Sequence, residues 1–215
     1  MLRRKDLLRF YRKAPRGTRL YLRVKLRICP LLPLEELYPR TGKVVDLGCG
    51  NGVFSNILKL GAPGRDVLGV DLDPRKVEAA RASHAGRAGL EFREGDIAAM
   101  DYPAADVFSL VDVLYLIPLD KQEEILRKCH AALRPGGTLI IKEMDKRPRW
   151  KYVWNLCQET IAVKVAGFTL GSRFYFRSGE DYVRLLEALG FKAEVVRLDR
   201  GQAYPHIAIR GAKGT

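Results

Sequence analysis

Several kinds of residue are scarce in this chain of 215 residues. Only four cysteines and three histidines occur, and no two cysteines form a Cys-x-x-Cys pair. This excludes a disulfide framework or a zinc site as an organising element, so no metal is expected and a reduced, cytoplasmic protein is indicated. No apolar run reaches the roughly eighteen residues of a transmembrane helix. The first residues also lack the apolar run and cleavage site of a signal peptide.

Acidic residues are nearly absent from the first 28 positions. Residues 1–28 hold eleven Lys or Arg and one acid, Asp6, so they carry +10 of the net charge of +13. An arm of this kind suits a nucleic acid, an anionic membrane surface or an acidic partner. A solvated helix face is the alternative.

What the chain does have is a regular alternation of apolar runs and amphipathic stretches. Short buried strands are predicted at Lys43–Leu47, Val67–Asp71, Leu90–Arg93, Val107–Val111 and Thr138–Lys142. Helices are predicted between them at Val53–Leu60, Pro74–His84 and Asp120–Leu133. Such alternation predicts an α/β fold, with a doubly wound, mostly parallel sheet that has helices on both faces.

The two ends of the chain add to this pattern. Beyond the fifth strand we expect helices at Arg149–Phe168 and Ser178–Leu189, then a closing pair of strands at Ala193–Leu198 and His206–Arg210, which makes seven strands. The predicted division is a basic helical arm or cap (1–42) and one domain (43–215), with a substrate-lid insert (146–177).

The arm is ambiguous between strand and helix. Leu22–Ile28 alternates as a strand does, yet arginines recur at helical spacing, and we favour two short helices broken near Pro15. Phe10, Tyr21, Val24 and Ile28 then lie largely opposite the arginine stripe.

The strongest local signal is Val44-Val45-Asp46-Leu47-Gly48-Cys49-Gly50-Asn51-Gly52, a buried strand that runs into three alternating glycines. Glycines allow positive φ and let a ligand approach bare backbone beside a helix N-terminus. A dinucleotide fingerprint would require glycine at Val53. The carboxylate of Asp46 would repel a pyrophosphate but tolerate a ligand with an ammonium group.

The segment from Asp46 to Gly52 resembles the first motif of class I S-adenosylmethionine-dependent methyltransferases, in particular those that act on small or lipid-like molecules. Val70–Pro74, Glu94–Ile97, Asp106–Tyr115 and Arg134–Ile141 resemble the motifs that follow. The resemblance implies that Asp71 grips the ribose hydroxyls, Asp96 accepts from the adenine amino group and Ile97 packs on the ring. The cofactor residues that it implies are Asp46, Gly48, Cys49, Gly50, Asn51, Gly52, Asp71, Leu72, Asp96, Ile97, Val111 and Asp112.

The implied reaction is an in-line methyl transfer, for which the enzyme must align a nucleophile about 3 Å from the methyl carbon. Candidates for a general base near the mouth are Asp112, Tyr115, Glu143, Tyr175 and His206, and each could instead be structural. No Asn/Asp-Pro-Pro-Tyr sequence follows the fourth strand, which disfavours methylation of exocyclic amines. No cysteine closely follows that strand, which disfavours covalent catalysis at a pyrimidine C5.

The acceptor is the open question. Residues 146–154 place four cations among three aromatics, so Trp150 and Trp154 are expected to line a lid that suits an anionic or aromatic acceptor. Three hypotheses remain: a methyltransferase for a small or lipid-like acceptor, with residues 1–28 on the inner face of an anionic membrane or closing the pocket; an RNA methyltransferase, with the arm along phosphates; and a non-catalytic S-adenosylmethionine-binding protein. The first is favoured.

Overall fold

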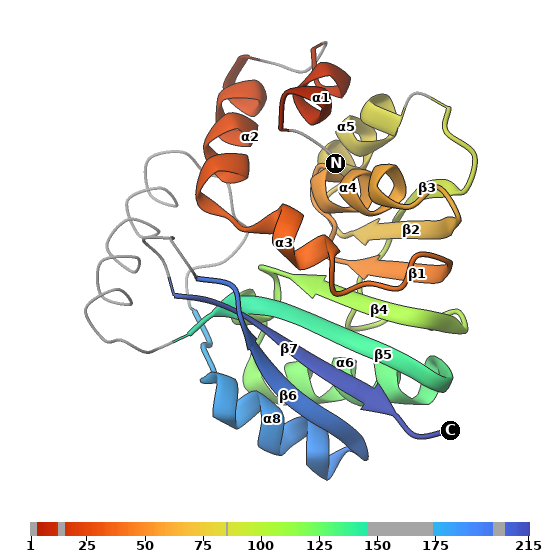
Figure 1. Ribbon diagram of the computed structural model, residues 1–215, viewed down its shortest axis with the longest axis vertical. Coiled ribbons are helices and arrows are strands. Elements are labelled where there is room, and N and C mark those ends of the chain that lie inside the picture. The colour runs from red at the N-terminus through yellow and green to blue at the C-terminus, as the bar shows by residue number, and fades with distance from the viewer. Residues whose placement is uncertain (1–3, 13–15, 85, 146–173, 200–204) are drawn as a thin grey trace.

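The chain folds around one seven-stranded sheet, shown in Figure 1. The computed structural model describes residues 4–12, 16–84, 86–145, 174–199 and 205–215. The strands follow the order β3-β2-β1-β4-β5-β7-β6; β7 pairs antiparallel with both β5 and β6, and the pairs among β1 to β5 are parallel. Their bounds are β1 Gly42–Leu47, β2 Arg65–Asp71, β3 Leu90–Glu94, β4 Ala105–Val111, β5 Leu133–Met144, β6 Phe191–Arg197 and β7 His206–Lys213. The predicted α/β class with a mostly parallel, seven-stranded sheet is confirmed.

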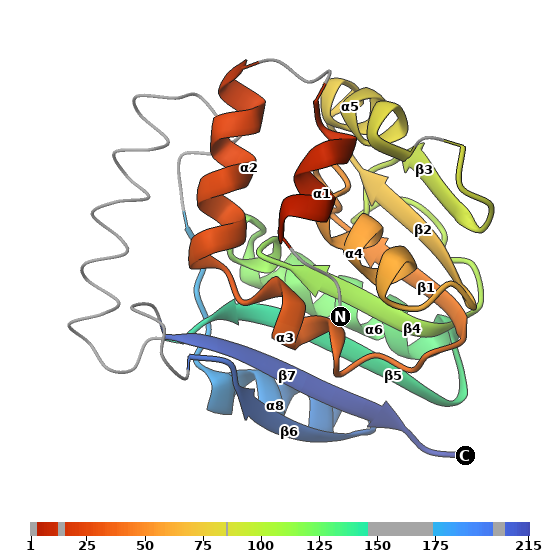
Figure 2. The ribbon, with the colours of Figure 1, turned by 45° about the horizontal axis from the view of Figure 1, so that its top comes forward.

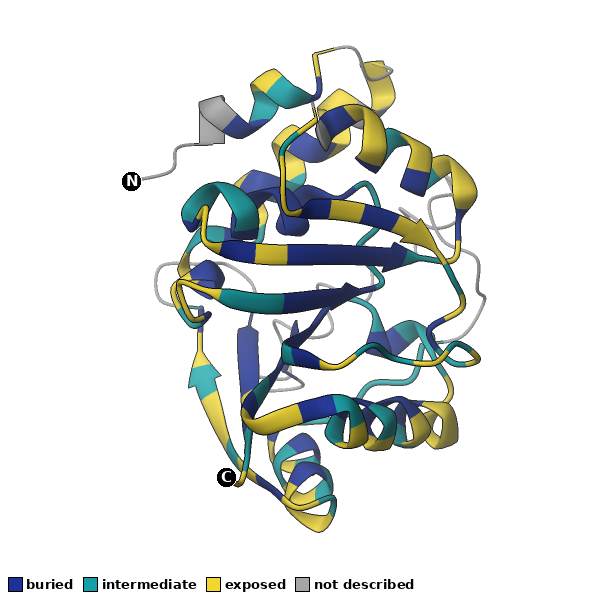
Figure 3. Ribbon diagram, turned by 90° about the vertical axis from the view of Figure 1, so that its right-hand side faces the viewer, coloured by how far each residue is buried: buried dark blue, intermediate teal, exposed yellow. Residues whose placement is uncertain are grey.

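Helices cover both faces of this sheet (Figure 1). One face carries α4 (Val53–Gly61) and α5 (Pro74–His84), with α1 (Arg4–Phe10), α2 (Arg16–Ile28) and α3 (Leu31–Glu35) on the same side; the other carries α6 (Leu119–Ala132) and α8 (Gly179–Ala188). Neighbouring residues of β1 show why both faces need cover: Val44 belongs to one buried apolar cluster and Val45 to the other. Figure 3 shows the buried residues concentrated in the central strands.

The predicted elements within the described ranges are present, with some differences at their ends. β5 begins at Leu133, upstream of the predicted start, because Leu133 already pairs with Ala105 before a register shift in β4. The short helix α3 was not predicted, since Pro33 stands within it. Proline is tolerated there because the first turn of a helix needs no N–H partner. The predicted helix at Arg149–Phe168 and the break near Pro15 lie outside the described residues.

The arm is helical, as predicted, but its apolar face differs from the prediction. Leu22 and Leu26 are the buried residues of α2, and α1 packs on both α2 and α4. Tyr21, Val24 and Ile28 are instead 36%, 49% and 36% exposed. The neighbouring arginines extend to solvent from the flank of the leucine stripe, so the stripe can turn inward. Figure 2 shows α2 standing beside α1 at one end of the sheet.

One buried arginine fastens the segment that joins the arm to β1. The side chain of Arg65 is fully buried and its Nη1 donates to Glu35 Oε1 at 2.5 Å. The same guanidinium donates to the carbonyls of Pro39, Leu58 and Tyr38 at 2.6, 2.8 and 3.0 Å. All three nitrogens therefore have acceptors, as a buried guanidinium requires.

Candidate active site

The parallel strands end together at one edge of the sheet, which we name the carboxyl edge. It lies on the left in Figure 1, on the side of α2. The strand order reverses between β1 and β4. At such a point the connections leave in opposite directions and open a crevice, where ligands of doubly wound folds bind.

The loop after β1 supplies bare backbone at this edge. Gly48, Gly50 and Gly52 all have positive φ, at 76°, 55° and 72°. A Cβ added at Gly50 would meet no atom within 4 Å, whereas one added at Gly52 would lie 2.7 Å from the ring of Phe92. The glycine at position 52 is therefore needed for packing, and the one at position 50 leaves open space beside the backbone.

The carboxylate of Asp71 lies at the end of β2, beside that loop. It accepts hydrogen bonds from the backbone N–H of Gly50 at 2.7 Å and of Asp73 at 3.0 Å. Asp73 in turn accepts from the backbone N–H of Arg75 at 3.0 Å, at the start of α5. Asp73, directly before Pro74, is thus the cap of α5, and the carboxylate of Asp71 stays at the carboxyl edge.

Apolar and acidic groups continue along the edge from there. Leu72 is 58% exposed, which is unusual for a leucine beside buried strands. Asp96, after β3, is exposed and accepts from the backbone N–H of Ala98 at 2.8 Å. Ile97 is 7% exposed and packs in the core beneath. The edge therefore carries the exposed apolar side chain of Leu72 together with the carboxylate oxygens of Asp71 and Asp96.

Three further residues implied by the first motif are more enclosed. Asp46 is 1% exposed and accepts from Ser55 Oγ at 2.5 Å; burial raises its pKa to about 6 despite that hydrogen bond. The thiol of Cys49 is half-buried, and burial raises its pKa. The carbonyl of Asn51 accepts from the hydroxyl of Tyr11 at 3.0 Å, so the arm touches the glycine loop directly.

Asp112 follows Val111 at the end of β4 and has the unusual φ of 56° for a residue other than glycine. Its backbone N–H donates to the carbonyl of Lys142 at 3.0 Å. Its carboxylate accepts from the buried ammonium of Lys142 and lies 3.6 Å from Lys25 Nζ. Burial would raise the pKa of Asp112, but the two lysines outweigh it and lower the value to about 2.

Neither lysine was among the residues expected from the sequence. Lys142 interrupts an apolar strand, and a lysine at such a position is buried only when it is paired, so the sequence did contain a signal. Lys25 lies on the helix face of Leu22 and Leu26. A helical wheel centred on those two leucines, rather than on the arginines, would have placed it inward.

Glu143 lies on the opposite face of the sheet from its neighbour Lys142. Its Oε1 accepts from the backbone N–H groups of Leu114 and Tyr115 at 3.0 and 3.4 Å, and the side chain is 2% exposed. Burial, followed by the negative charge of Asp112, raises its pKa to about 8. Glu143 therefore holds the loop after β4, and its raised pKa means that it takes up a proton more readily than an ordinary glutamate.

His206 begins β7, on the arm side of the sheet. Its Nε2 lies 2.9 Å from the carbonyl oxygen of Ile28, at the end of α2, and the residue is 2% exposed. Burial, together with the charge of Lys142, lowers its pKa to about 4. The imidazole is therefore neutral at pH 7 and ties the arm to the sheet.

The two predicted tyrosines lie together, near Glu143. The ring of Tyr115 stacks on Phe176 with centroids 5.2 Å apart, and its carbonyl accepts from the backbone N–H of Tyr175 at 2.8 Å. Gln122, which the sequence did not indicate, is buried and donates to the carbonyl of Tyr175 at 2.9 Å. The five candidate bases thus divide between the two faces and do not converge on one point.

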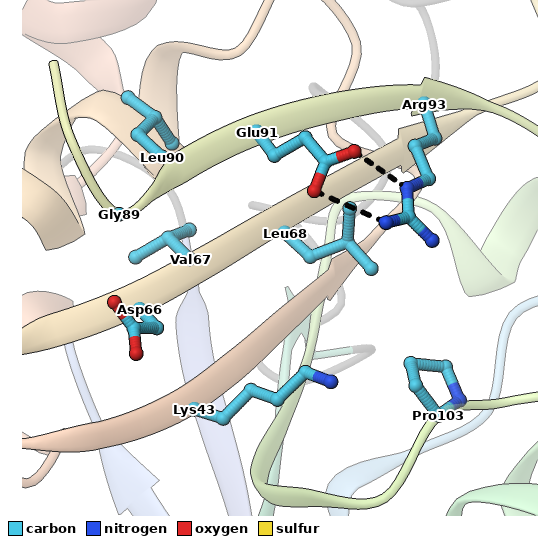
Figure 4. A pocket seen from close by; sticks show the side chains of 9 residues that line it. All are labelled: Lys43, Asp66, Val67, Leu68, Gly89, Leu90, Glu91, Arg93 and Pro103. Carbon is cyan, nitrogen blue, oxygen red and sulfur yellow. Dashed lines mark hydrogen bonds and ion pairs between the residues drawn. The ribbon is translucent and has the colours of Figure 1, made fainter.

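Two cavities open at the opposite edge of the sheet, away from these residues. Figure 4 shows one of about 280 Å³, where Glu91 and Arg93 of β3 pair beside Lys43 and Asp66. The other is lined by the starts of β1 and β5, including Gly42 and Gly137. Both lie at the amino ends of the strands, so we do not assign them to the carboxyl-edge chemistry.

Some expectations fall outside the described ranges. Trp150 and Trp154 of the expected lid are among those residues. Within the ranges that the structure describes, no group of three or more His, Cys, Asp or Glu side chains could hold a metal ion. No helix in those ranges is long and apolar enough to cross a membrane.

Comparison with known proteins identifies a family to which the chain is similar. Residues 40–174 match the family model described as a methyltransferase domain. A ubiquinone biosynthesis O-methyltransferase of Leptothrix cholodnii is 30% identical over 112 residues, 50% of this chain and 46% of that protein. A demethylmenaquinone methyltransferase of Thermus thermophilus is 25% identical over 182 residues, 78% and 82% of the two chains. The chain spans about half the length of the matched ubiquinone relatives.

Solved structures agree on the fold. An S-adenosylmethionine-dependent methyltransferase, SibL, has a TM-score of 0.72 at 21% identity, over 93% of this chain and 57% of that one. Magnesium protoporphyrin IX methyltransferase from Synechocystis has a TM-score of 0.67 at 19% identity, over 97% and 94%. Together with the strand order and the motifs at the carboxyl edge, the family match confirms the predicted resemblance: the chain belongs to the methyltransferase-domain family, in the class I, S-adenosylmethionine-dependent fold.

Proposed function

We propose that this chain binds S-adenosylmethionine at the carboxyl edge and transfers its methyl group to a small or lipid-like acceptor. One observation carries the proposal: open space beside the bare backbone of Gly50 adjoins the carboxylate of Asp71. A side chain at position 50 would fill the space where a nucleoside must lie. The carboxylate supplies two acceptor oxygens, which suits a pair of ribose hydroxyls.

The other residues fit the rest of that cofactor. Leu72 and Ile97 offer apolar contact for adenine, and Asp96 an acceptor for its amino group. The remaining proposed contacts, for the methionine portion, are Asp46, Gly48, Cys49, Asn51, Gly52, Val111 and Asp112. When bound, the cofactor supplies a methyl group activated by a sulfonium, so the protein's task is to orient an acceptor and exclude water.

Names of relatives support a small acceptor. The relatives include proteins named for ubiquinone biosynthesis, demethylmenaquinone and trans-aconitate methylation.

We propose the division into an arm (1–42) and a methyltransferase domain (43–215), with residues 146–177 as a substrate lid. Joint replacement of Trp150 and Trp154 by alanine should then lower turnover and spare cofactor affinity. Unchanged turnover would reduce the insert to a structural element.

The arm supports a peripheral contact with an anionic membrane. The solvent-facing side of α2 exposes four arginines, Arg16, Arg19, Arg23 and Arg27. On the same helix Leu20 and Val24 are 62% and 49% exposed. Each cation near an anionic bilayer contributes about 1 kcal/mol, and apolar side chains add to it. We therefore propose a cytoplasmic protein that rests on the inner membrane face.

Co-sedimentation with phosphatidylglycerol vesicles tests the arm. Reversal of Arg16, Arg23 and Arg27 to glutamate should abolish binding, while reversal of the exposed Lys121 and Arg127 on α6 should leave it intact. Binding that is stronger to structured RNA, and that falls steeply with salt, would favour the nucleic-acid alternative.

The activity itself is tested with methyl-labelled S-adenosylmethionine and fractionated cell extract. Label that enters the small-molecule or lipid fraction supports the proposal. Label confined to RNA would favour an RNA methyltransferase. Tight cofactor binding without transfer to any fraction would favour a non-catalytic binding protein.

A further inference from the structure

A lysine of the arm reaches the carboxyl edge. Lys25 Nζ lies 3.6 Å from Asp112 Oδ2, and its side chain keeps 23% of its surface exposed. Its neighbours on the inner face of α2, Leu22 and Leu26, are buried and fix the helix in this rotation. Part of the Lys25 side chain is therefore open to solvent beside the carboxylate of Asp112.

The charges around Asp112 do not cancel. Lys142 already supplies one buried cation to its carboxylate, so Lys25 is a second ammonium against one acid. Asp46, at the end of β1, also feels the charge of Lys25. S-adenosylmethionine, with a sulfonium, an ammonium and one carboxylate, would add a net positive charge that offsets Asp46. With the proposed cofactor bound, Lys25 and Lys142 remain two ammonium groups against the one carboxylate of Asp112.

The candidate bases are engaged elsewhere. Asp112 is held ionised between two lysines, and a carboxylate so stabilised is a weak base. His206 is buried against the arm, and Glu143 is buried on the other face beneath Leu114. Tyr115 stacks on Phe176, and its backbone carbonyl accepts from the N–H of Tyr175. Asp112, Glu143 and His206 are therefore not placed to remove a proton from an acceptor.

We propose, on the basis of the function proposed above, that the acceptor is an acid that arrives already ionised, with its anionic oxygen held by Lys25. A lone pair of that oxygen forms the new O–C bond, and the electrons of the broken C–S bond stay on sulfur. Two opposite charges disappear and no proton moves, so no general base is needed. The uncharged product loses its attraction to Lys25, which favours its release.

The test uses a matched pair of probes, para-fluorobenzoate and para-fluorobenzamide, followed by fluorine NMR with the protein saturated with S-adenosylhomocysteine. The wild-type protein should bind the carboxylate at least about tenfold more tightly than the amide, as a charge-assisted hydrogen bond provides. Lys25→Met should abolish that preference, Lys25→Arg should keep most of it, and Lys121→Met on α6 should leave it unchanged.

The outcomes separate the two proposals. Failure of the wild-type protein to bind S-adenosylhomocysteine in titration calorimetry would refute the cofactor assignment. Normal binding of that ligand with no preference for the carboxylate, or with a preference that survives Lys25→Met, would refute only the anionic acceptor. Lys25→Gln serves as a second variant without the ammonium group. Retained affinity of this variant for S-adenosylhomocysteine would show that loss of the ammonium group does not in itself unfold the protein.

Discussion

Two buried clusters of opposite charges in this protein differ in how completely their partners are satisfied. Arg65, at the start of β2, is fully buried and pairs with Glu35 and three backbone carbonyls. Asp112, at the end of β4, has a left-handed backbone and shares its carboxylate between Lys142 and Lys25. The first cluster is closed, whereas the second keeps strain and a partly exposed cation.

The two clusters lie at opposite ends of the strands, and we expect the one at the amino end to affect stability and the one at the carboxyl edge to affect ligand binding. The Arg65 cluster at the amino end fastens the arm to the sheet, and each nitrogen of its guanidinium already has an acceptor within the protein. Strained backbone and uncompensated charge are tolerated where binding uses them. Substitutions at the amino end should therefore change stability alone, and those at the carboxyl edge should change ligand binding.

The largest effect is expected from Arg65→Met. The buried carboxylate of Glu35 would lose its main cation, and breaking such a pair costs about 3–5 kcal/mol. Urea unfolding should record that loss, while calorimetry on the folded protein shows normal affinity for S-adenosylhomocysteine. A loss of affinity without a loss of stability would erase the contrast between the two clusters.

Two glycines of one loop sharpen the comparison. Gly50→Val should still fold, because its Cβ would meet no neighbouring atom. The left-handed backbone should cost about 1–2 kcal/mol of stability, and cofactor binding should be lost. Gly52→Val should be the less stable of the two, since its Cβ would lie 2.7 Å from Phe92 and 2.8 Å from Ala80. Thermal unfolding measures which of the two variants is less stable, and titration calorimetry measures whether each binds the cofactor. Normal binding by the Gly50 variant would move the cofactor elsewhere.

An effect that depends on pH is expected from Glu143→Gln. The pKa of this carboxyl rises from 4.5 to about 8 on folding, so the folded state binds the proton more tightly. Wild-type stability from this group is full below pH 4.5 and falls as pH rises toward 8. Glutamine does not titrate and retains an oxygen for Leu114.

The stability of the glutamine variant relative to wild type should therefore increase with pH, by up to about 1.4 kcal/mol per unit in that window. Urea unfolding at pH 5 and pH 8 measures the change. A constant difference would show that Glu143 does not titrate as its burial requires.

The sequence was sufficient for the parts that local chemistry fixes. Alternating apolar runs predicted the sheet and placed Asp71 at the end of its second strand. Contacts between distant segments were beyond it. The pairing of Lys25 with Asp112 depends on how α2 rotates, and Gln122 binds Tyr175 across 53 positions. Helical periodicity can place Lys25 on the inner face of α2, but it does not identify Asp112 as its partner, nor Tyr175 as the partner of Gln122.

The central claim, a cofactor held by the carboxylate at the end of β2, is tested most directly by calorimetric titration of S-adenosylmethionine into Asp71→Ala. A hydrogen bond to a charged group contributes roughly 1.5–3 kcal/mol of binding free energy, so its loss should lower the affinity about ten- to a hundredfold. Asp73→Ala, which removes only the cap of α5, is the control and should bind normally. Unchanged affinity of the Asp71 variant, or tight binding of NADH by the wild-type protein, would contradict the account.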